Sequence, residues 1–582
     1  MFRCVIALLV VAVSVVLAKG QSAVPAAGKA DAYVRAVREY CDKVLACGLD
    51  VYGPKHTPLF VDGVEVETLA PVKWQYRDLT WIPANLANHQ NLFRAFVGLS
   101  ALTGDARYRQ AAVEAMRYGI DNLQSSSGLL YWGGHTTYDA NSDDWVGRRK
   151  LLKTPSPYHE FMNHLPFYQL MWDVDPNYTV KFLGALWSGH VIEWSNLDIN
   201  RHAYMNKPLP APNWDAEYVG GPVFYVSKGR SFIPIATDLI YAAATLYRFT
   251  GDPRALVWAR RLAHRYVEAR DPNTGLSGPI YNHYEDPDRA DAQFGDALPG
   301  HRVMEATMWS PHTSMRADLL WMMTGQMLGA EGKELTQWAL EDLRAVAEVG
   351  YDRQRKVFQG MLIDGTNVEK VLKTRSGYFG AKGTPIRDAE GASPDAFCAY
   401  ALAARISNDA FYWDMARELA SAIKLGDIGE GPPVATHREG DPDKPGAAPR
   451  LDMAITSTDE TNIVALLHLH RMTGRTEYLD QACRIADNVL ATKRANGLFV
   501  DGEQFRYTRL DSPYALVLLQ LAAALTGREA EVPDYWFSAS YFACEWKDGT
   551  RYSYDYGLYH ELRPGAASQP ATRESAAEEA AE

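Results

Sequence analysis

The chain has 582 residues, of which 47% are hydrophobic and 22% are charged, and its formal net charge is −12 at pH 7. This composition is typical of a soluble protein, and the acidic balance argues against a nucleic-acid partner or an anionic membrane surface. An anionic sugar is not excluded, because a small binding site needs only a few local Arg and Lys side chains.

The first 18 residues have the pattern of a secretory signal peptide. Arg3 supplies a positive charge, Val5 to Leu17 form an apolar run, and Val16-Leu17-Ala18 resembles a cleavage site. The run is short for a membrane-spanning helix, which needs about 20 apolar residues. We therefore expect removal of residues 1–18, a periplasmic or secreted protein and no membrane attachment after cleavage; an uncleaved anchor is the alternative.

Five cysteines remain after the signal: Cys41, Cys47, Cys398, Cys483 and Cys544. The odd number leaves at least one thiol free, and the absence of a CxxC motif argues against a zinc ribbon or a thioredoxin-type site. Cys41 and Cys47 are a candidate pair, although the sequence alone does not assign the pairing.

Along the mature chain, Ala30 to Cys47 and Ile82 to Gly98 are expected to form helices. A Thr-Gly phrase then recurs, and it predicts helical hairpins, because Gly suits a helix C-cap and a following Asp or Thr can begin the next helix. Its occurrences are Leu102-Thr103-Gly104-Asp105, Phe249-Thr250-Gly251-Asp252, Met323-Thr324-Gly325, Met472-Thr473-Gly474-Arg475 and Leu525-Thr526-Gly527-Arg528.

A second phrase follows the second helix of each expected hairpin, as in Ser127-Gly128-Leu129, Thr274-Gly275-Leu276, Asn496-Gly497-Leu498-Phe499 and, more weakly, Lys356 to Gly360. Thr-Gly turns would thus lie at one end of the molecule and Gly-Leu loops at the other. Repeated helix pairs without alternating strands favour a closed α/α barrel over an open helical array.

The C-terminal part of the chain has two further features. The aromatic-rich stretch from Tyr535 to Tyr559, with Ser538 to Trp546, has a composition that could form strands, so a small β appendage there is compatible with the fold. Residues 564–582 are rich in Ala, Glu and Ser and are predicted to be disordered. No domain boundary is evident, so residues 19–563 are expected to form one domain.

Chemistry-bearing residues gather in three motifs between Tyr131 and Tyr204. They are Tyr131-Trp132-Gly133-Gly134-His135, directly after a Gly-Leu phrase, Ser156-Pro157-Tyr158-His159-Glu160, and Asn200-Arg201-His202. Imidazole with carboxylate suits a divalent transition metal such as Zn, Mn, Co or Ni, and three ligands leave open positions.

Two of these motifs also have a structural explanation. Glu160 could simply match the dipole of a helix that begins at Ser156 and Pro157. His159 or His164 could replace it as a ligand, and His135 could be an ordinary loop histidine.

The order Gly-Gly-His, then His-Glu opening a helix, then Asn-Arg-His resembles polysaccharide lyase family 2, the pectate lyases with an α/α barrel. The stretch from Lys228-Gly229-Arg230-Ser231-Phe232 to Asp238-Leu239-Ile240-Tyr241 is also similar. The resemblance implies an all-α (α/α) barrel of seven helical hairpins with minor β segments.

The resemblance also implies site roles. His135, Glu160 and His202 would bind a divalent metal, Mn-like, with Co, Ni, Zn or Ca as alternatives. Arg201 would be the catalytic base, and Lys228, Arg230 and Tyr204 would bind an anionic polysaccharide or oligogalacturonide. We expect a monomer or a simple homo-oligomer.

The implied reaction is β-elimination from a polyuronate, in which removal of the C5 proton builds negative charge on the adjacent carboxylate. Arginine is ordinarily protonated, so the base role of Arg201 rests on the resemblance, and a bidentate carboxylate clamp is the alternative. Lys228 and Arg230 could equally form a solvated basic loop. A glycoside hydrolase of the α/α-barrel type acting on uronic-acid oligosaccharides, or a binding-only receptor, are the other function classes.

Overall fold

The computed structural model describes most of the chain, except that the predicted signal peptide and all but the start of the predicted tail lie outside the described residues. The described residues are 26–76, 78–147, 157–284, 303–304, 311–370, 389–431, 448–546, 551–554 and 556–566.

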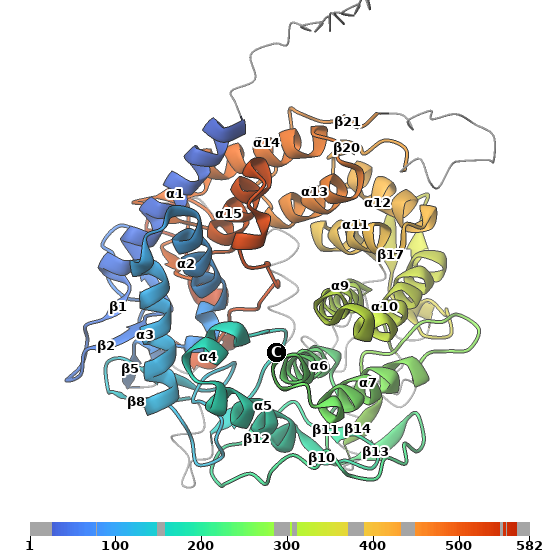
Figure 1. Ribbon diagram of the computed structural model, residues 1–582, viewed down its shortest axis with the longest axis horizontal. Coiled ribbons are helices and arrows are strands. Elements are labelled where there is room, and N and C mark those ends of the chain that lie inside the picture. Colours follow the sequence, from blue (N-terminus) through green and yellow to red (C-terminus); the bar gives the residue numbers. More distant parts are fainter. Residues whose placement is uncertain are drawn as a thin grey trace, which may run out of the picture.

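The helices stand in two concentric rings around a central axis (Figure 1). The inner ring holds α2 (Gln90–Thr103), α4 (Tyr168–Val174), α6 (Ile233–Thr250), α9 (Pro311–Leu328), α11 (Pro394–Ser407), α13 (Glu460–Thr473) and α15 (Pro513–Thr526). The outer ring holds α1 (Ala26–Cys47), α3 (Ala106–Asn122), α5 (Pro176–His190), α7 (Pro253–Glu268), α10 (Lys333–Ala345), α12 (Ala410–Ala422) and α14 (Glu477–Thr492).

Each inner helix from α2 to α13 packs against the outer helix that follows it in the chain, and α15 packs against α1, which closes the ring. Among the described residues these contacts make seven helix pairs. The prediction of an all-α (α/α) barrel of seven hairpins is confirmed.

Hydrophobicity explains which helix takes which ring. Helix α6 is buried at every position from Ile233 to Leu246, and α15 is buried without interruption from Ala515 to Ala523. A helix that is apolar all round must be covered on all sides, whereas a helix with one apolar stripe faces water. Helix α7, with buried Leu256, Ala259 and Ala263 along one face, is of the second kind.

Four of the five Thr-Gly phrases end helices as predicted. Gly104, Gly251, Gly474 and Gly527 cap α2, α6, α13 and α15 with φ between 68° and 73°. This left-handed backbone favours glycine because a Cβ would be strained there.

The fifth Thr-Gly phrase was interpreted wrongly, because α9 continues through Gly325 to Leu328. A Cβ on Gly325 would overlap Oγ1 of Thr336 and would lie 2.8 Å from the carbonyl oxygen of Gly332. Glycine is therefore needed at this position for the close approach of α9 and α10, which is a tertiary requirement.

The helix expected from Ile82 to Gly98 begins later, at Gln90. Asp139 accepts the Ile82 N–H at 2.6 Å, and Asp62 accepts the Asn85 N–H at 2.6 Å. These contacts hold the start of the segment extended, as strand β6 (Pro83–Ala84), and the 3₁₀ turn η1 (Leu86–His89) then leads into α2.

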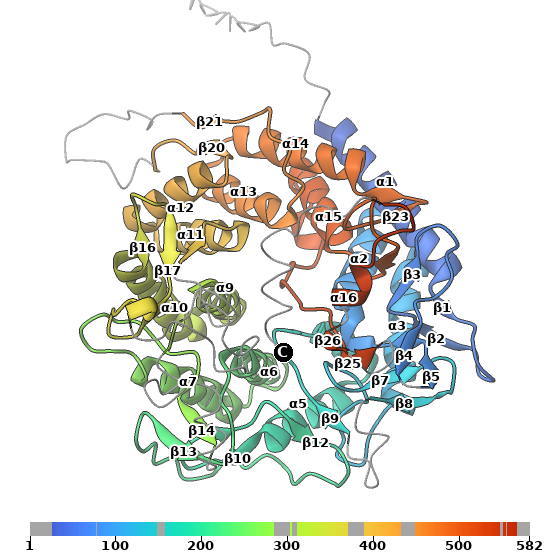
Figure 2. The same ribbon diagram turned by 180° about the vertical axis from the view of Figure 1, so that it is seen from behind.

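Short strands lie in the loops that connect the helices of the barrel, and Figure 2 shows several of them beside α2 and α3. The strand pairs are β1 (Leu49–Asp50) with β2 (Thr57–Phe60), β3 (Gly63–Glu65) with β24 (Tyr507–Arg509), β4 (Trp74–Tyr76) with β5 (Leu79–Trp81), β6 with β7 (Thr137–Asp139), β7 with β8 (Asp144–Val146), β9 (Tyr158–His159) with β12 (Ala203–Tyr204), β10 (Val191–Glu193) with β11 (Asp198–Ile199), β13 (Tyr225–Ser227) with β14 (Asn282–Tyr284), β15 (Val303–Met304) with β18 (Met361–Leu362), β17 (Val357–Gln359) with β16 (Tyr351–Asp352) and β19 (Ala389–Gly391), β20 (Gly426–Asp427) with β21 (Arg450–Leu451), β22 (Arg494–Ala495) with β23 (Leu498–Phe499), and β25 (Ala543–Trp546) with β26 (Arg551–Tyr554).

The last of these pairs, β25 with β26, is an antiparallel hairpin within the aromatic-rich stretch from Tyr535 to Tyr559, and only Ala543–Trp546 of the Ser538 to Trp546 region is a strand. Cys41, Cys47, Cys398 and Cys483 are free thiols, so the candidate pairing of Cys41 with Cys47 is wrong. Among the described helices, none combines the length and the apolar character that crossing a membrane requires.

Candidate active site

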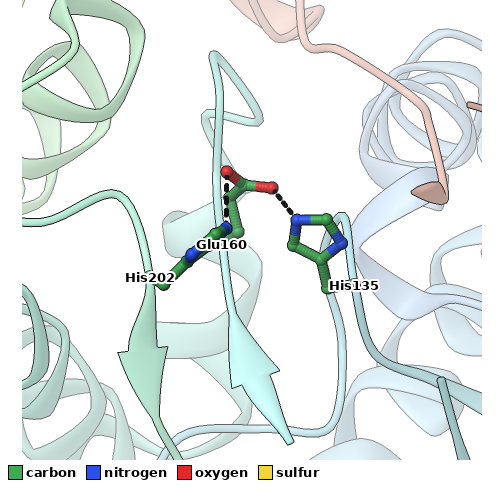
Figure 3. Close-up of side chains that lie close together, drawn as sticks. All are labelled: His135, Glu160 and His202. Atoms are coloured by element: carbon green, nitrogen blue, oxygen red, sulfur yellow. Dashed lines mark ion pairs between the residues drawn. The ribbon is translucent and has the colours of Figure 1, made fainter. Parts of the chain in front are cut away.

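Three side chains from the motifs between Tyr131 and Tyr204 converge at one point (Figure 3). Nε2 of His135 lies 2.7 Å from Oε2 of Glu160, and Nε2 of His202 lies 3.4 Å from Oε1 of the same carboxylate. One ligand atom from each residue lies within 4.8 Å of the others. The three residues therefore form a candidate metal site.

Strand pairing places Glu160 beside His202. In the antiparallel pair β9–β12, Ala203 lies opposite His159 and Tyr204 lies opposite Tyr158. Glu160 follows β9 and His202 precedes β12, so the register brings both side chains to the same end of the pair.

This arrangement corrects the prediction that Glu160 lies in the first turn of a helix. Tyr158 and His159 form a strand, Ser156 lies outside the described residues, and α4 begins only at Tyr168. The reason is tertiary: pairing with β12 uses the backbone groups of β9, and the Gly134 N–H donates to the Glu160 carbonyl at 3.1 Å.

A glycine turn presents His135 to Glu160. Gly133 has φ 109°, and a Cβ there would lie 2.6 Å from the Glu160 carbonyl oxygen. The Asn85 side chain donates to the Gly133 carbonyl at 2.7 Å and accepts the Gly133 N–H at 3.0 Å. The loop is thereby held close against the segment that carries the carboxylate.

The charges of the site favour ligand chemistry. Burial by itself raises the pKa of Glu160, but His135, Arg201 and His202 outweigh that effect and hold the pKa well below its usual value. Burial lowers the pKa of His202 to about 4, although Glu160 opposes the change. At neutral pH the site thus offers an ionised carboxylate and a neutral imidazole at position 202, the forms that bind metals.

The candidate ligand atoms lie close to one another, but their geometry is unsuitable for hydrogen bonds between them. Nε2 of His202 and both carboxylate oxygens of Glu160 are buried and make no well-aligned hydrogen bond within the described residues. Buried polar atoms normally have such partners. An imidazole nitrogen and a carboxylate left in this state, with a second imidazole beside them, fit a transition-metal site.

The Arg201 side chain lies next to the Glu160 carboxylate of the candidate metal site. Its Nε is 3.5 Å from Oε1 of Glu160, and its guanidinium carbon is 5.4 Å from the ring centroid of Phe232. The side chains of His135, Arg201 and His202 are 17%, 20% and 19% exposed, so solvent reaches the site while Glu160 is fully buried.

Arg230 joins Arg201 around one aromatic ring. Its guanidinium carbon is 5.6 Å from the Phe232 centroid, and a parallel bridge links its backbone to Asn200. Arg230 is 3% exposed, which rules out the alternative of a solvated basic loop for this residue. The side chain of Lys228, two residues earlier, is exposed.

Tyrosines border the site on the other side. The Tyr158 ring stacks on His202 with centroids 4.9 Å apart and an interplanar angle of 5°. The Tyr204 hydroxyl lies 3.4 Å from that of Tyr158, and Tyr204 is 49% exposed. Sequence reasoning named Tyr204 but missed Tyr158, although its place next to His159-Glu160 could have indicated it.

The alternative histidine ligands lie outside the three-residue group. Nδ1 of His159 is 3.1 Å from Nε2 of His190, whose Nδ1 is 2.7 Å from the Asn200 carbonyl oxygen. Nδ1 of His164 accepts the Met162 N–H at 3.0 Å. Both histidines are buried, and these contacts account for one nitrogen of each ring.

One further neighbour comes from the distant C-terminal part of the chain. The Tyr541 ring centroid is 4.8 Å from that of His164, and a Cβ on Gly134 would lie 2.5 Å from the Tyr541 ring. Nothing in the local sequence around Tyr541 signals this position, since it depends on the path of the chain after α15.

Comparisons with known proteins show the family to which this chain belongs. Residues 57–545 match the family model described as periplasmic pectate lyase. A pectate disaccharide-lyase of Dickeya dadantii (strain 3937) is 28% identical over 531 residues, which are 86% of this chain and 91% of the relative. These matches identify the protein as a polysaccharide lyase. The chain belongs to the periplasmic pectate lyase family.

Solved structures give only distant likenesses. An α-1,2-mannosidase from Trichoderma reesei is 10% identical, with a TM-score of 0.43, 88% of this chain covered and 94% of that chain. The cellobiose 2-epimerase of Bacillus thermoamylovorans B4167 is 13% identical, with a TM-score of 0.39, 85% of this chain covered and 100% of that chain. Such low scores carry no conclusion about the chemistry of this protein.

Proposed function

We propose that the protein cleaves pectate-type polyuronates by metal-assisted β-elimination, with Arg201 as the base. The observation that carries the proposal is the convergence of His135, Glu160 and His202, with Arg201 3.5 Å from the same carboxylate. Family membership and a relative named for pectate support pectate as the substrate.

His135, Glu160 and His202 would hold the divalent metal. Two imidazoles with one carboxylate suit a Mn-like first-row ion, or Co, Ni or Zn, better than Ca, which prefers oxygen ligands throughout. When bound, the ion supplies positive charge that stabilises the negative charge developing on the substrate carboxylate.

Arg201 takes the C5 proton in this proposal. The electron pair of the C–H bond forms the C4–C5 double bond, the bond from C4 to the glycosidic oxygen breaks, and the departing oxygen is protonated by water. Arginine is ordinarily charged, so the base role requires a site that disfavours its cation. Positively charged neighbours, including a bound metal ion, disfavour the Arg201 cation. If Glu160 binds the metal, its negative charge is partly neutralised and attracts the Arg201 cation less strongly.

Arg230, Tyr204 and Lys228 would bind the substrate. A buried guanidinium beside Phe232 can hold a uronate carboxylate in bidentate fashion. The exposed Tyr204 ring offers a flat apolar surface for a sugar ring, and the exposed Lys228 would attract a more distant carboxylate. Arg230→Ala should therefore raise KM for polygalacturonate, and its metal content should stay near that of the parent.

The family description supports a periplasmic location. We propose in addition that residues 1–18 are removed on export and that residues 19–563 form one catalytic unit, which is a monomer or a simple homo-oligomer. N-terminal sequencing of the exported protein tests this proposal. A mature chain that begins after Ala18 is expected, whereas an intact N-terminus in the membrane fraction would contradict it.

An absorbance assay tests the activity. β-Elimination creates a 4,5-unsaturated product that absorbs ultraviolet light, so the absorbance of a polygalacturonate solution should increase with time. A chelator should stop this increase, and added Mn²⁺ should restore it. Alginate provides a comparison of uronate identity. New reducing ends without the chromophore would instead indicate a glycoside hydrolase, and neither signal would indicate a binding protein.

A further inference from the structure

A cavity of about 700 Å³ lies inside the helical ring, apart from the candidate metal site. It is lined by α2, by Phe167 and Gln169 at the start of α4, by the C-terminal halves of α6, α9, α11 and α13, and by residues 530–534 and 536 after α15. Arg248 and Arg405 stand in the last turns of α6 and α11, so the cavity opens toward the end of the barrel that carries the Thr-Gly turns.

The candidate metal site lies toward the other end. His135, Glu160 and His202 belong to connections that lead from outer helices to the starts of inner helices, whereas α6, α9, α11 and α13 line the cavity with their C-terminal halves. The 700 Å³ volume falls within the usual range of small-ligand pockets, roughly 300–1,000 Å³.

The cavity is rich in positive charge within an acidic protein. Arg94, Arg248, Arg405 and Arg471 line it, against Glu531 and Asp534. Glu531 is already paired with Arg528 at 2.6 Å, and Arg471 with Glu529 at 2.9 Å, which leaves Arg94, Arg248 and Arg405 against Asp534. The dipoles of the inner helices favour cations at their C-terminal ends, which allows several guanidinium groups to gather there.

Polar atoms in the cavity wall lack partners. His468 is 6% exposed, and neither of its ring nitrogens has a hydrogen-bond partner within the described residues. Nε of the Arg405 guanidinium is in the same state. Leaving a buried polar group unsatisfied is unfavourable, so a wall of this kind suits a guest that supplies acceptors and hydroxyl groups.

Aromatic side chains complete the wall. The ring centroids of Tyr241 and Trp536 are 4.7 Å apart, with their planes inclined at 41°. Both rings line the cavity, together with Phe167 and Phe249. Aromatic faces can pack on the C–H faces of a sugar ring, and guanidinium groups pair with carboxylates.

We propose that this cavity is a second binding site for a short uronate oligosaccharide, of one or two sugar units. The choice of sugar rests on the proposed function, because a lyase acting on pectate releases acidic saccharides of this chemistry. The site itself stands on the charge, the unpartnered polar atoms and the aromatic wall.

Arg94 connects the cavity floor to the catalytic segment and is therefore unsuitable as a test position. It donates to the Leu165 carbonyl oxygen at 2.7 Å and to the Ser538 hydroxyl at 2.9 Å, and Leu165 follows Glu160 by five residues. Arg248 is exposed at the mouth, and Arg405 is half-buried, so their replacement leaves that segment in place.

The test measures digalacturonate binding by calorimetry in an Arg201→Ala background, where the sugar is not consumed. We expect Arg248→Glu with Arg405→Gln to weaken the cavity's binding at least about tenfold, the equivalent of one lost charge-assisted contact. Arg35→Glu, which repeats the Arg248→Glu substitution at an exposed position of α1, should bind like the parent. Arg248→Glu alone serves if the double variant unfolds.

Several results would overturn the proposal. Unchanged binding in the cavity variants would do so, as would equal binding of neutral galactobiose, or sulfate binding as tightly as the sugar. The absorbance assay on protein with Arg201 intact keeps the two proposals separate. If protein with Arg201 intact forms product but the cavity variants bind digalacturonate like the parent, only the cavity proposal is refuted. If the cavity variants lose binding but protein with Arg201 intact forms no unsaturated product, only the proposed function is refuted.

Discussion

The Nε of Arg201 lies 3.5 Å from Oε1 of Glu160, so the proposed base contacts a proposed metal ligand without itself offering a ligand atom to the group. His135 approaches the other oxygen of the same carboxylate, at 2.7 Å. Replacement of Arg201 should consequently affect the reaction, and replacement of the ligands should affect metal binding first.

Arg201→Ala is expected to reduce formation of the unsaturated product by about 10²–10⁴-fold, the usual contribution of a positioned general base. Metal content should remain near that of the parent. Arg201→Lys should also lose most activity, because lysine cannot reproduce the planar guanidinium. Absorbance kinetics and elemental analysis of the same preparations measure both quantities, and full turnover by Arg201→Ala would contradict the base and clamp roles together.

Changes to the ligands should lower metal content and activity in parallel. His202→Ala removes an imidazole, and Glu160→Gln removes the charge that both imidazoles approach. His264→Ala, an exposed histidine on the outer helix α7, is the matched control and should change neither quantity. A His202→Ala protein with the metal content of the parent would show that the ion is bound at a different place.

Gly133→Ala should damage the site, whereas Gly104→Ala should damage only stability. Both glycines have positive φ, at 109° and 73°, so each substitution costs about 1–2 kcal/mol of backbone strain. A Cβ on Gly133 would also lie 2.6 Å from the Glu160 carbonyl oxygen, while a Cβ on Gly104 meets nothing within 4 Å. Urea unfolding and metal titration of the two variants separate these effects; equal metal affinity would refute the positioning role.

Asp238 should make stability fall as the pH rises. Its carboxyl accepts the N–H groups of Leu165 and His164, and burial raises its pKa to about 7 despite these contacts. Because the folded state holds this proton more tightly than the unfolded state, the free energy of unfolding decreases between about pH 4 and pH 7.

The Asp238→Asn variant isolates this effect, because Asp511, whose pKa burial also raises to about 7, is present in both proteins. The stability advantage of the parent over the variant should shrink by up to about 4 kcal/mol across the window. Urea unfolding at a series of pH values measures the difference. An advantage that stays constant or grows with pH would contradict the assignment.

Local sequence was sufficient for the hairpin pattern, because the information lies within a few residues of each turn. Gly104 and Gly251 take the left-handed conformation that glycine tolerates best, and the following Asp105 and Asp252 cap the next helices. The same phrase failed at Gly325, where contact with Thr336 and Gly332 of the neighbouring segment decides the residue type. That contact has no local signature.

At the site, the sequence by itself determined which chemical groups are available: imidazoles at 135 and 202, a carboxylate at 160 and a guanidinium at 201. Only the tertiary structure decided that Glu160 lies at the end of a strand, because the backbone of β9 pairs with β12, more than 40 residues later in the chain. The cavity shows the same limit, since Arg94, Arg405 and Trp536 meet only after the ring closes. Backbone preference and side-chain chemistry belong to each residue, whereas the distance between remote residues depends on how the inner helices pack.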